Sequence, residues 1–236
     1  MYIEKELCKK CLDCRPVCPL GAIVVKDKEV LIDYETCVEC GVCRRMNICS
    51  EGAIKQVETI PYPRIVRAVF SDPTIRHEST GISGRGTEEM KTNDITNNFV
   101  EGKIGFSIEL GRPGVGANLT DLEKVVKELK RRKVEFAKDN PVMDLIADQE
   151  TGALRPEVLS EKVLSAIAEF IIDEDRAVDF ITEIKAFMNR ELDSVATMSV
   201  ISRADSNGDC LFMERLKNAG HDIYPNGKVN IGLALV

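Results

Sequence analysis

The sequence predicts an α+β protein in two parts, a small cysteine-rich module over residues 1–60 and a larger domain over residues 61–236. Three observations support this prediction. Eight of the nine cysteines precede residue 50, the composition changes at a proline-containing joint after Ile60, and segments of strand and helix periodicity alternate beyond residue 103. A length of 236 residues suits one large domain or two of ordinary size.

Composition and charge narrow the classes of function. The formal net charge is -7, tryptophan is absent and aromatic residues make up 5% of the chain. Nucleic-acid binding requires a basic face and often uses aromatic platforms, so we expect no nucleic-acid partner. No apolar run approaches the roughly 20 residues that cross a bilayer, and we expect no membrane partner.

Cysteine usage indicates the compartment. The first residues, Met-Tyr-Ile-Glu-Lys-Glu, lead directly into Cys8 without the apolar stretch of a secretory signal. We therefore expect a cytoplasmic, reducing location. In such a compartment, closely spaced cysteines bind metal or carry out redox chemistry more often than they form disulfides.

Eight cysteines form a duplicated pattern. The first set is Cys8, Cys11, Cys14 and Cys18, and the second set is Cys37, Cys40, Cys43 and Cys49. The first three cysteines repeat at an offset of 29 residues, and Gly-Ala-Ile begins three residues after the fourth cysteine of each set. Because three thiolates separated by two residues each can wrap a short loop around three corners of a cubane, the fourth corner needs a more distant ligand.

This pattern resembles that of bacterial-type ferredoxins with two [4Fe-4S] clusters, in which the fourth cysteine of a CxxCxxCxxxCP run binds the other cluster. The resemblance covers roughly residues 5–58. It implies that one cluster is held by Cys8, Cys11, Cys14 and Cys49, and the other by Cys37, Cys40, Cys43 and Cys18. It also implies electron transfer as the function of this module.

The second half of the repeat departs from the family pattern. Five residues, RRMNI, separate Cys43 from Cys49, and Ser50 stands where proline is usual. We expect the longer loop to reshape the surface beside the first cluster while leaving its ligands intact. A pair of zinc knots is an alternative, since CxxC pairs also hold tetrahedral zinc, but it would leave the third cysteine of each run unused.

Between the two cysteine sets the sequence predicts a β-hairpin, in which Ile23 to Val25 and Val30 to Ile32 flank the polar turn KDKE. Basic residues also lie within the cysteine loops. They either offset the charge of the clusters and steer an acidic redox partner, or form an ordinary solvated surface. These residues are Lys9, Lys10, Arg15, Arg44 and Arg45.

A joint containing Pro61 and Pro63 opens the second part of the chain, and the apolar run from Ile65 to Phe70 is a strand candidate. The polar segment of residues 71–102 is too long for an idle connection. It is therefore either a lid or docking loop, or a mobile hydrophilic excursion. It contains His77, which has no neighbouring cysteine or carboxylate pair that would indicate a metal or acid-base site.

The clearest element of the second part is a strand followed by a helix. Apolar and polar residues alternate from Ile104 to Leu110, as a half-buried strand requires. Apolar residues then recur at helical spacing from Leu119 to Leu129, with Thr120 and Glu123 placed as a capping box. The connecting loop GRPGVGAN offers backbone amides to an anion, although it lacks the P-loop lysine and the dinucleotide glycine spacing.

This turn resembles that of ACT domains, the amino-acid-sensing modules with a βαββαβ order, whose turn often reads Asp-Arg-Pro-Gly. Gly111 stands where that family has the acid. The resemblance implies that an amino acid or small carboxylate binds at Gly111, Arg112, Gly114 and Gly116. Plain turn geometry accounts for the same residues without a ligand.

The remaining segments continue the alternation. LRPEVLSEKVLSAIAEFII fits either a short helix plus a strand or one helix, DEDRAVDFITEIKAFMNREL predicts a helix, VATMSVIS a strand, DCLFMERLKNAG a helix ending at Gly220, and KVNIGLALV a closing strand. We expect Cys210 to be a buried, inert thiol. The order suits a ferredoxin-like or ACT-like α+β sandwich that duplicates the unit around residues 103–136.

Two hypotheses for function follow. The first is an electron-transfer protein or subunit of an anaerobic redox enzyme complex, in which two [4Fe-4S] clusters relay electrons while the larger domain docks a partner or binds a regulatory metabolite. The second is a redox-linked, ACT-like regulatory protein that senses a metabolite. Autonomous catalysis would need a nucleophile and base, and no Ser-His-Asp grouping or metal-binding histidine pair is visible. The oligomeric state stays open, a homodimer included.

Overall fold

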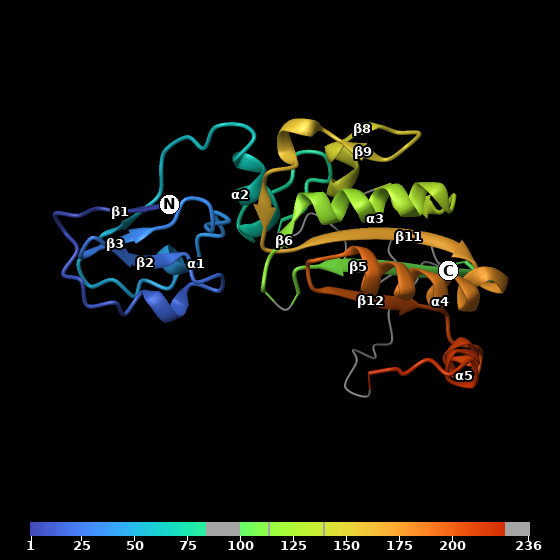
Figure 1. The fold of residues 1–236 in the computed structure, drawn as a ribbon. Coiled ribbons are helices and arrows are strands. Elements are labelled where there is room, and N and C mark those ends of the chain that lie inside the picture. The colour runs from blue at the N-terminus through green and yellow to red at the C-terminus, as the bar shows by residue number, and fades with distance from the viewer. Residues whose placement is uncertain (84–99, 113, 139, 225–236) are drawn as a thin grey trace.

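A computed structural model describes residues 1–83, 100–112, 114–138 and 140–224. The chain forms two lobes that lie side by side, with roughly the first 60 residues in one lobe and the remainder in the other (Figure 1). Each lobe has its own hydrophobic core of buried side chains, and among the described residues the two cores have no member in common.

The N-terminal lobe is built from short elements. They are β1 (Tyr2–Ile3), a 3-10 turn (Arg15–Val17), β2 (Ile23–Lys26), β3 (Glu29–Ile32), α1 (Val42–Arg45) and β4 (Ile54–Lys55). Strands β2 and β3 form the predicted hairpin. Asp27 and Lys28 connect them with φ angles of 51° and 63°, which is the backbone of a two-residue turn that matches the twist of the strands. The hairpin prediction is confirmed.

The second lobe contains the remaining elements. They are α2 (Ile65–Ser71), β5 (Lys103–Leu110), β6 (Ala117–Asn118), α3 (Leu119–Arg131), β7 (Glu135–Phe136), a 3-10 helix (Pro141–Leu145), β8 (Ile146–Asp148), β9 (Ala153–Leu154), a 3-10 turn (Pro156–Val158), β10 (Lys162–Val163), β11 (Ala166–Asp173), α4 (Glu174–Glu191), β12 (Ala196–Ile201) and α5 (Leu211–Asn218).

The centre of this lobe is a four-stranded antiparallel sheet in the order β12-β5-β11-β7. Helices α3 and α4 connect these strands and pack against the sheet (Figure 1). Aromatic rings join the layers, because the Phe106 and Phe170 centroids lie 5.3 Å apart in a stack and Phe180 of α4 lies 5.3 Å from Phe106. The lobe is thus a sheet with two helices, as an α+β fold requires.

Strand β5 follows the predicted segment but is buried on both faces, so the expectation of a half-buried strand is wrong. Ser107 and Glu109, on the face away from Phe106, are 1% and 4% exposed. Glu109 accepts hydrogen bonds from Arg112 at 2.6 Å and from Ser199 at 3.3 Å. The alternation of apolar and polar residues in β5 therefore divides two buried faces, one that packs apolar side chains and one that packs hydrogen-bonded polar side chains.

The strand expected at Ile65 to Phe70 is wrong, because these residues form the helix α2. Val66 and Phe70, four residues apart, enter the core of the second lobe. Arg64 and Arg67, three residues apart, contact the N-terminal lobe instead. Helical spacing gives each set a face of its own, whereas a strand would mix the two sets.

The capping box expected at Thr120 and Glu123 is also wrong. Helix α3 begins at Leu119, and its N-cap residue Asn118 makes no side-chain capping hydrogen bond. The Glu123 carboxylate accepts a hydrogen bond from the Leu154 amide at 3.1 Å, which links α3 to β9. The residues next to Glu123 in the sequence give no indication of this contact with a distant segment.

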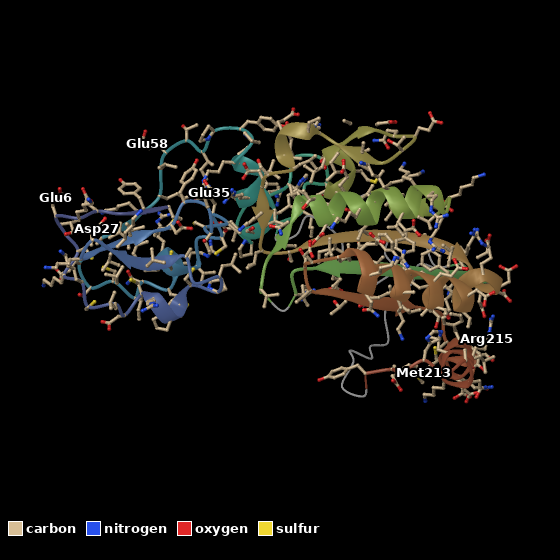
Figure 2. All side chains as sticks on the ribbon, in the orientation of Figure 1. Glu6, Asp27, Glu35, Glu58, Met213 and Arg215 are labelled. Carbon is tan, nitrogen blue, oxygen red and sulfur yellow. The ribbon has the colours of Figure 1, made fainter. Side chains whose placement is uncertain are left out.

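The later elements agree better with the sequence. The ambiguous segment resolves into a 3-10 turn and the strands β10 and β11, and the predicted helix and strand at α4 and β12 are confirmed. Helix α5, which carries Met213 and Arg215 (Figure 2), ends before Gly220. Arg215 pairs with Glu174 of α4 at 2.6 Å. The expected closing strand KVNIGLALV lies outside the described residues, as do residues 84–99 of the long polar segment. In the described part of the chain, no helix combines the length and apolarity that a membrane span requires.

Gly111, at the end of β5, offers a test of this packing. It has a φ angle of 80°, and a Cβ added there would lie 2.6 Å from the Leu164 carbonyl oxygen and 2.8 Å from the Gly116 carbonyl carbon. Gly102 has a φ angle of 79° but open space around it. An alanine at either position carries a left-handed strain of about 1–2 kcal/mol, and only Gly111→Ala adds a clash of about 1–3 kcal/mol.

We therefore expect Gly111→Ala to lower the urea midpoint of unfolding clearly more than Gly102→Ala does. Circular dichroism of the two variants and of the wild type measures these midpoints. Equal midpoints for the two variants would contradict the tight packing described here.

Candidate metal centre

The two cysteine loops of the N-terminal lobe have the same backbone bends. Lys10 and Glu39 have φ angles of 59° and 54°, and Leu12 and Gly41 both have a φ angle of 68°. Each pair is separated by the 29 residues of the sequence repeat. Left-handed residues at these places let a short loop curl so that its side chains point inward. The duplication seen in the sequence is therefore a duplication of conformation.

The fourth cysteines are held in equivalent ways. The Ala22 amide donates to the Cys18 Sγ at 3.2 Å, and the Ala53 amide donates to the Cys49 Sγ at 3.3 Å. Both alanines belong to the repeated Gly-Ala-Ile, and the glycines before them are left-handed. An amide that points at a sulfur stabilises its negative charge. The repeated tripeptide thus supplies one such donor to each set.

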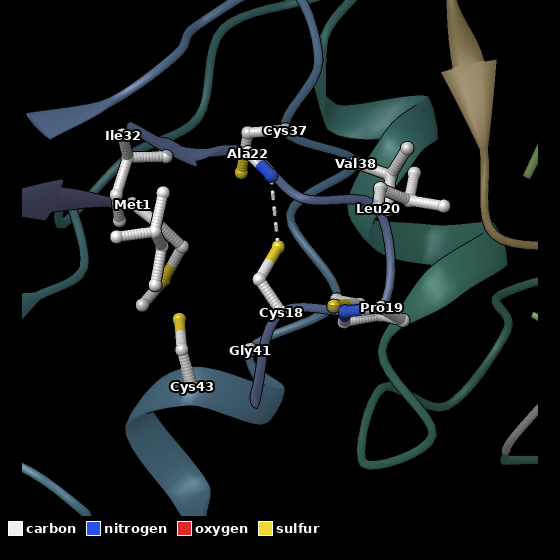
Figure 3. A pocket seen from close by; sticks show the side chains of 12 residues that line it. Met1, Cys18, Pro19, Leu20, Ala22, Ile32, Cys37, Val38, Gly41 and Cys43 are labelled. Carbon is white, nitrogen blue, oxygen red and sulfur yellow. Dashed lines mark hydrogen bonds between the residues drawn. The ribbon is translucent and has the colours of Figure 1, made fainter. Parts of the chain in front are cut away.

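Cys18 does not lie with the other cysteines of its own run. It lines one pocket together with Cys37, Cys40 and Cys43 of the second run (Figure 3). The other residues of the pocket wall are mostly apolar and are Met1, Pro19, Leu20, Ala22, Ile23, Ile32, Val38 and Gly41. The structure therefore brings four thiols from both halves of the repeat around one volume that is shielded from water.

Crowding of these thiols has an electrostatic consequence. Burial, together with negative charge on Cys40, Cys37 and Cys18, raises the pKa of the Cys43 thiol to about 11. Burial also raises the pKa of Cys37 and of Cys40. The four sulfurs can all become thiolates only when a cationic group replaces their protons, as metal binding does.

The second set of four is more open to solvent. Burial raises the pKa of Cys14, and nearby charge on Cys11, Cys49 and Cys8 acts in the same direction. Charge on Cys49, the fourth cysteine of the second run, thus acts on a cysteine of the first run. Cys11 is exposed and the other three are half-buried, whereas Cys37, Cys40 and Cys43 are buried.

The donor sets fit iron-sulfur clusters. Each set offers four sulfur ligands, which is the complement that a [4Fe-4S] cluster takes from a protein. Tetrahedral zinc also accepts four thiolates, but in the described part of the chain no three Cys, His, Asp or Glu side chains are arranged to hold a single metal ion. The pocket groups Cys18 with the second run, and the crosswise ligation by Cys18 and Cys49 that the resemblance implied stays a prediction.

The basic residues of the cysteine loops have several different partners. Lys9 pairs with Glu51 and Lys10 with Glu29, both at 2.7 Å on the surface. Arg44 donates to Gln56, and Arg15 is exposed. Arg45 differs from these residues, because it donates to the Cys40 carbonyl and pairs with Asp72, both at 2.6 Å. Arg45 therefore connects a cysteine loop to the end of α2.

Sequence reasoning missed two further residues at this junction. Arg64 and Arg67 are buried, and both donate hydrogen bonds to the carbonyl oxygen of Cys37, at 3.4 Å and 2.9 Å. The Arg64 guanidinium also lies 3.4 Å from the centroid of the Tyr34 ring. Their spacing of three residues was the available signal, because it places two cations on one face of a helix.

The candidate ligand loop in the second lobe lies against the cysteine lobe. A Cβ added at Gly116 would be 3.2 Å from the methyl groups of Leu20, which follows Cys18 by two residues. Arg112 pairs with Glu109 at 2.6 Å, and Gly111 is closely surrounded by backbone. Gly114 has a φ angle of 91° and open space around it. Close packing thus accounts for two glycines of the loop, Gly116 against the cysteine lobe and Gly111 within the second lobe.

The other singled-out residues do not join this centre. His77 is buried, where its ring packs edge-on against Phe70 at 5.8 Å and its Nδ1 lies 3.0 Å from the Ser79 hydroxyl. Burial lowers the pKa of His77, against the opposing effect of Asp144. Cys210 is half-buried beside Ser202, with Sγ and Oγ 2.9 Å apart. These contacts describe structural roles.

Comparisons with known proteins concern the N-terminal lobe. The chain is 50% identical to Ferredoxin-1 of Rhodobacter capsulatus over 40 residues, which is 17% of this chain and 62% of that protein. It is 40% identical over 52 residues to the ferredoxin-like protein in the vnf region of Azotobacter vinelandii, which is 21% of this chain and 80% of that protein.

A third relative is the pyruvate synthase subunit PorD of Methanothermobacter marburgensis, 41% identical over 54 residues, or 23% of this chain and 60% of that protein. The chain thus spans less than two thirds of Ferredoxin-1 and of PorD. No family model matches the chain, and no solved structure matches it significantly. The ferredoxin-like relative of Azotobacter vinelandii is matched over most of its length, so this chain belongs, through its N-terminal lobe, to the ferredoxin family.

Proposed function

We propose that this chain is an iron-sulfur electron-transfer protein or a subunit of an oxidoreductase complex. It holds one [4Fe-4S] cluster on Cys8, Cys11, Cys14 and Cys49, and a second on Cys37, Cys40, Cys43 and Cys18. The observation that carries the proposal is that Cys18 lines a pocket with three cysteines from the other half of the repeat. When bound, the clusters supply one-electron redox chemistry.

The protein's own residues adapt the two sites to different tasks. The first set includes the exposed Cys11, which places its cluster within reach of a docked partner. In the second set Cys37, Cys40 and Cys43 are buried and Cys18 is half-buried, and the flank of this set is covered by α2 and by the loop at Gly116. Electrons therefore enter and leave by way of the first set, while the second set lies against the larger lobe.

The partner is a protein rather than a nucleic acid or a membrane. One relative is by its name a subunit of a pyruvate synthase, and we propose that this chain also works with a larger cytoplasmic redox enzyme. A simple ferredoxin needs only the N-terminal lobe, so the second lobe is available for docking. Homodimer formation remains compatible with this proposal.

The second lobe supports an ACT-like or ferredoxin-like arrangement. Its sheet elements follow the order β5, α3, β7, β11, α4, β12, which is a single βαββαβ unit with its strands in the order β12-β5-β11-β7. A regulatory metabolite bound at Gly111, Arg112, Gly114 and Gly116 would act directly on Leu20 beside Cys18. This contact favours redox-linked metabolite sensing as the second candidate function, although Arg112 already pairs with Glu109.

Metal analysis of cysteine variants tests the ligand assignment. Two [4Fe-4S] clusters correspond to about eight iron atoms per chain, and Cys18→Ala should lower the iron and sulfide content by up to about half. Cys49→Ala should affect the other centre, so the two variants should lose different EPR signals from the dithionite-reduced protein. Cys210→Ala removes the ninth cysteine and should leave the metal content and EPR spectrum unchanged.

Anaerobic purification precedes this measurement, with iron, zinc and acid-labile sulfide determined on the same sample. Stoichiometric zinc without iron would end the electron-transfer proposal. Cys11→Ala and Cys40→Ala identify the signals of the first and second runs, and loss of the Cys11 signal from Cys18→Ala, with loss of the Cys40 signal from Cys49→Ala, would contradict the crosswise assignment alone.

A thermal-shift screen separates docking from metabolite sensing. Amino acids and small carboxylates are added to the anaerobic, cluster-loaded chain, and the melting temperature is measured for wild type and Arg112→Gln. If the second lobe only docks a partner protein, no compound should raise the melting temperature by more than about 1 °C. A metabolite that binds at 100 times its Kd would instead stabilise the folded chain by about 2.7 kcal/mol. A carboxylate that stabilises the wild type but not Arg112→Gln would support the sensor instead.

A further inference from the structure

Two buried arginines at the junction between the lobes remain to be explained. Arg64 and Arg67 are 5% and 3% exposed and belong to the beginning of α2. A buried guanidinium is stable only when it is paired and its hydrogen-bond donors are satisfied. The partners of the two arginines therefore indicate what each of them does.

Arg67 connects a cysteine loop to the second lobe. Its Nη1 donates to the carbonyl oxygens of Cys37 and Glu35, both at 2.9 Å. Its Nε pairs with the carboxylate of Glu161, which is buried just before β10. Arg67 thus presents positive charge to a residue that we assign as a cluster ligand, and its buried counter-charge, Glu161, belongs to the second lobe and not to the cysteine loops.

Arg64 has a different balance of charge. Its Nε and Nη2 donate to the Glu39 carboxylate at 2.9 Å and 2.7 Å. Glu39 itself stands between Cys37 and Cys40 in the sequence. Glu39 also pairs with the Met1 amino group at 2.6 Å, so the counter-charge of Arg64 lies in the N-terminal lobe. Of the two arginines, only Arg67 has its buried counter-charge, Glu161, outside the cysteine lobe.

We propose that the Arg67–Glu161 pair sets the reduction potential of the cluster held by Cys37, Cys40, Cys43 and Cys18, with Arg67 as a positioning residue. This inference rests on the proposed function. Reduction adds a negative charge to the cluster, and a buried cation nearby stabilises the reduced form. A hydrogen bond to the Cys37 carbonyl also fixes the ligand loop from outside. Glu161 acts in the opposite direction, because its charge repels the added electron.

The proposal predicts shifts of opposite sign for the two members of the pair. Arg67→Gln should move the midpoint potential of one cluster to a more negative value, and Glu161→Gln should move the same potential to a more positive value. Arg67→Lys keeps the charge but loses the planar fork, so its shift should be smaller than that of Arg67→Gln. Arg190→Gln, at an exposed position on α4, should change neither potential.

The measurement is an anaerobic redox titration of the intact chain followed by EPR, in which the cluster of Cys8, Cys11, Cys14 and Cys49 serves as the internal reference. A wild-type sample without iron would contradict the proposed function before any variant is titrated. With both clusters present, shifts of the same sign in Arg67→Gln and Glu161→Gln would indicate loosened packing and overturn the inference. Equal shifts in both clusters, or none, would overturn it as well. If Arg67→Gln does not fold, the sign of the Glu161→Gln shift and the size of the Arg67→Lys shift decide the question.

Discussion

The structure of the N-terminal lobe depends on one electrostatic constraint, the crowding of four thiols in a space with little water. Burial disfavours negative charge on each sulfur, and charge on neighbouring sulfurs disfavours it further; both effects raise the pKa of Cys43. Backbone amides aimed at the sulfurs, such as those of Ala22 and Ala53, reduce this repulsion but do not remove it. Binding of a multiply charged inorganic group would remove this repulsion, and the loops curl around the place where such a group would bind.

The second lobe adds a different environment to one of the two sets. Helix α2 contacts Cys37 through Arg64 and Arg67, Asp72 reaches the Cys40 loop through Arg45, and the Gly116 loop packs on Leu20. The set that contains Cys11 remains open to solvent. One chain thus places two similar sulfur sets in unlike surroundings, and unlike surroundings give iron-sulfur clusters unlike potentials.

Local signals carried most of what the sequence could predict. Cysteine spacing, the hairpin turn at Asp27 and Lys28, and the long periodicity of α4 are each contained within a few residues of chain. The crosswise position of Cys18 came from the family resemblance rather than from its spacing.

The errors share a cause, which is contact between distant segments. The run from Ile65 to Phe70 is too short to distinguish helix from strand by periodicity, and it becomes a helix where its two faces meet two different lobes. Glu123 has the spacing of a capping residue, but its carboxylate accepts a hydrogen bond from the Leu154 amide instead. Strand β5 reads as half-buried because nothing in its own residues reveals that its polar face is covered too.

The two cysteine loops have matching positive φ angles, at Lys10 and Glu39 and at Leu12 and Gly41. A basic and an acidic side chain occupy one equivalent position, and a leucine and a glycine occupy the other. The two halves of the repeat therefore share main-chain torsion angles at positions where their side chains differ in charge and size. A relative whose sequence no longer resembles this one would therefore still be recognisable by the φ angles of its cysteine loops.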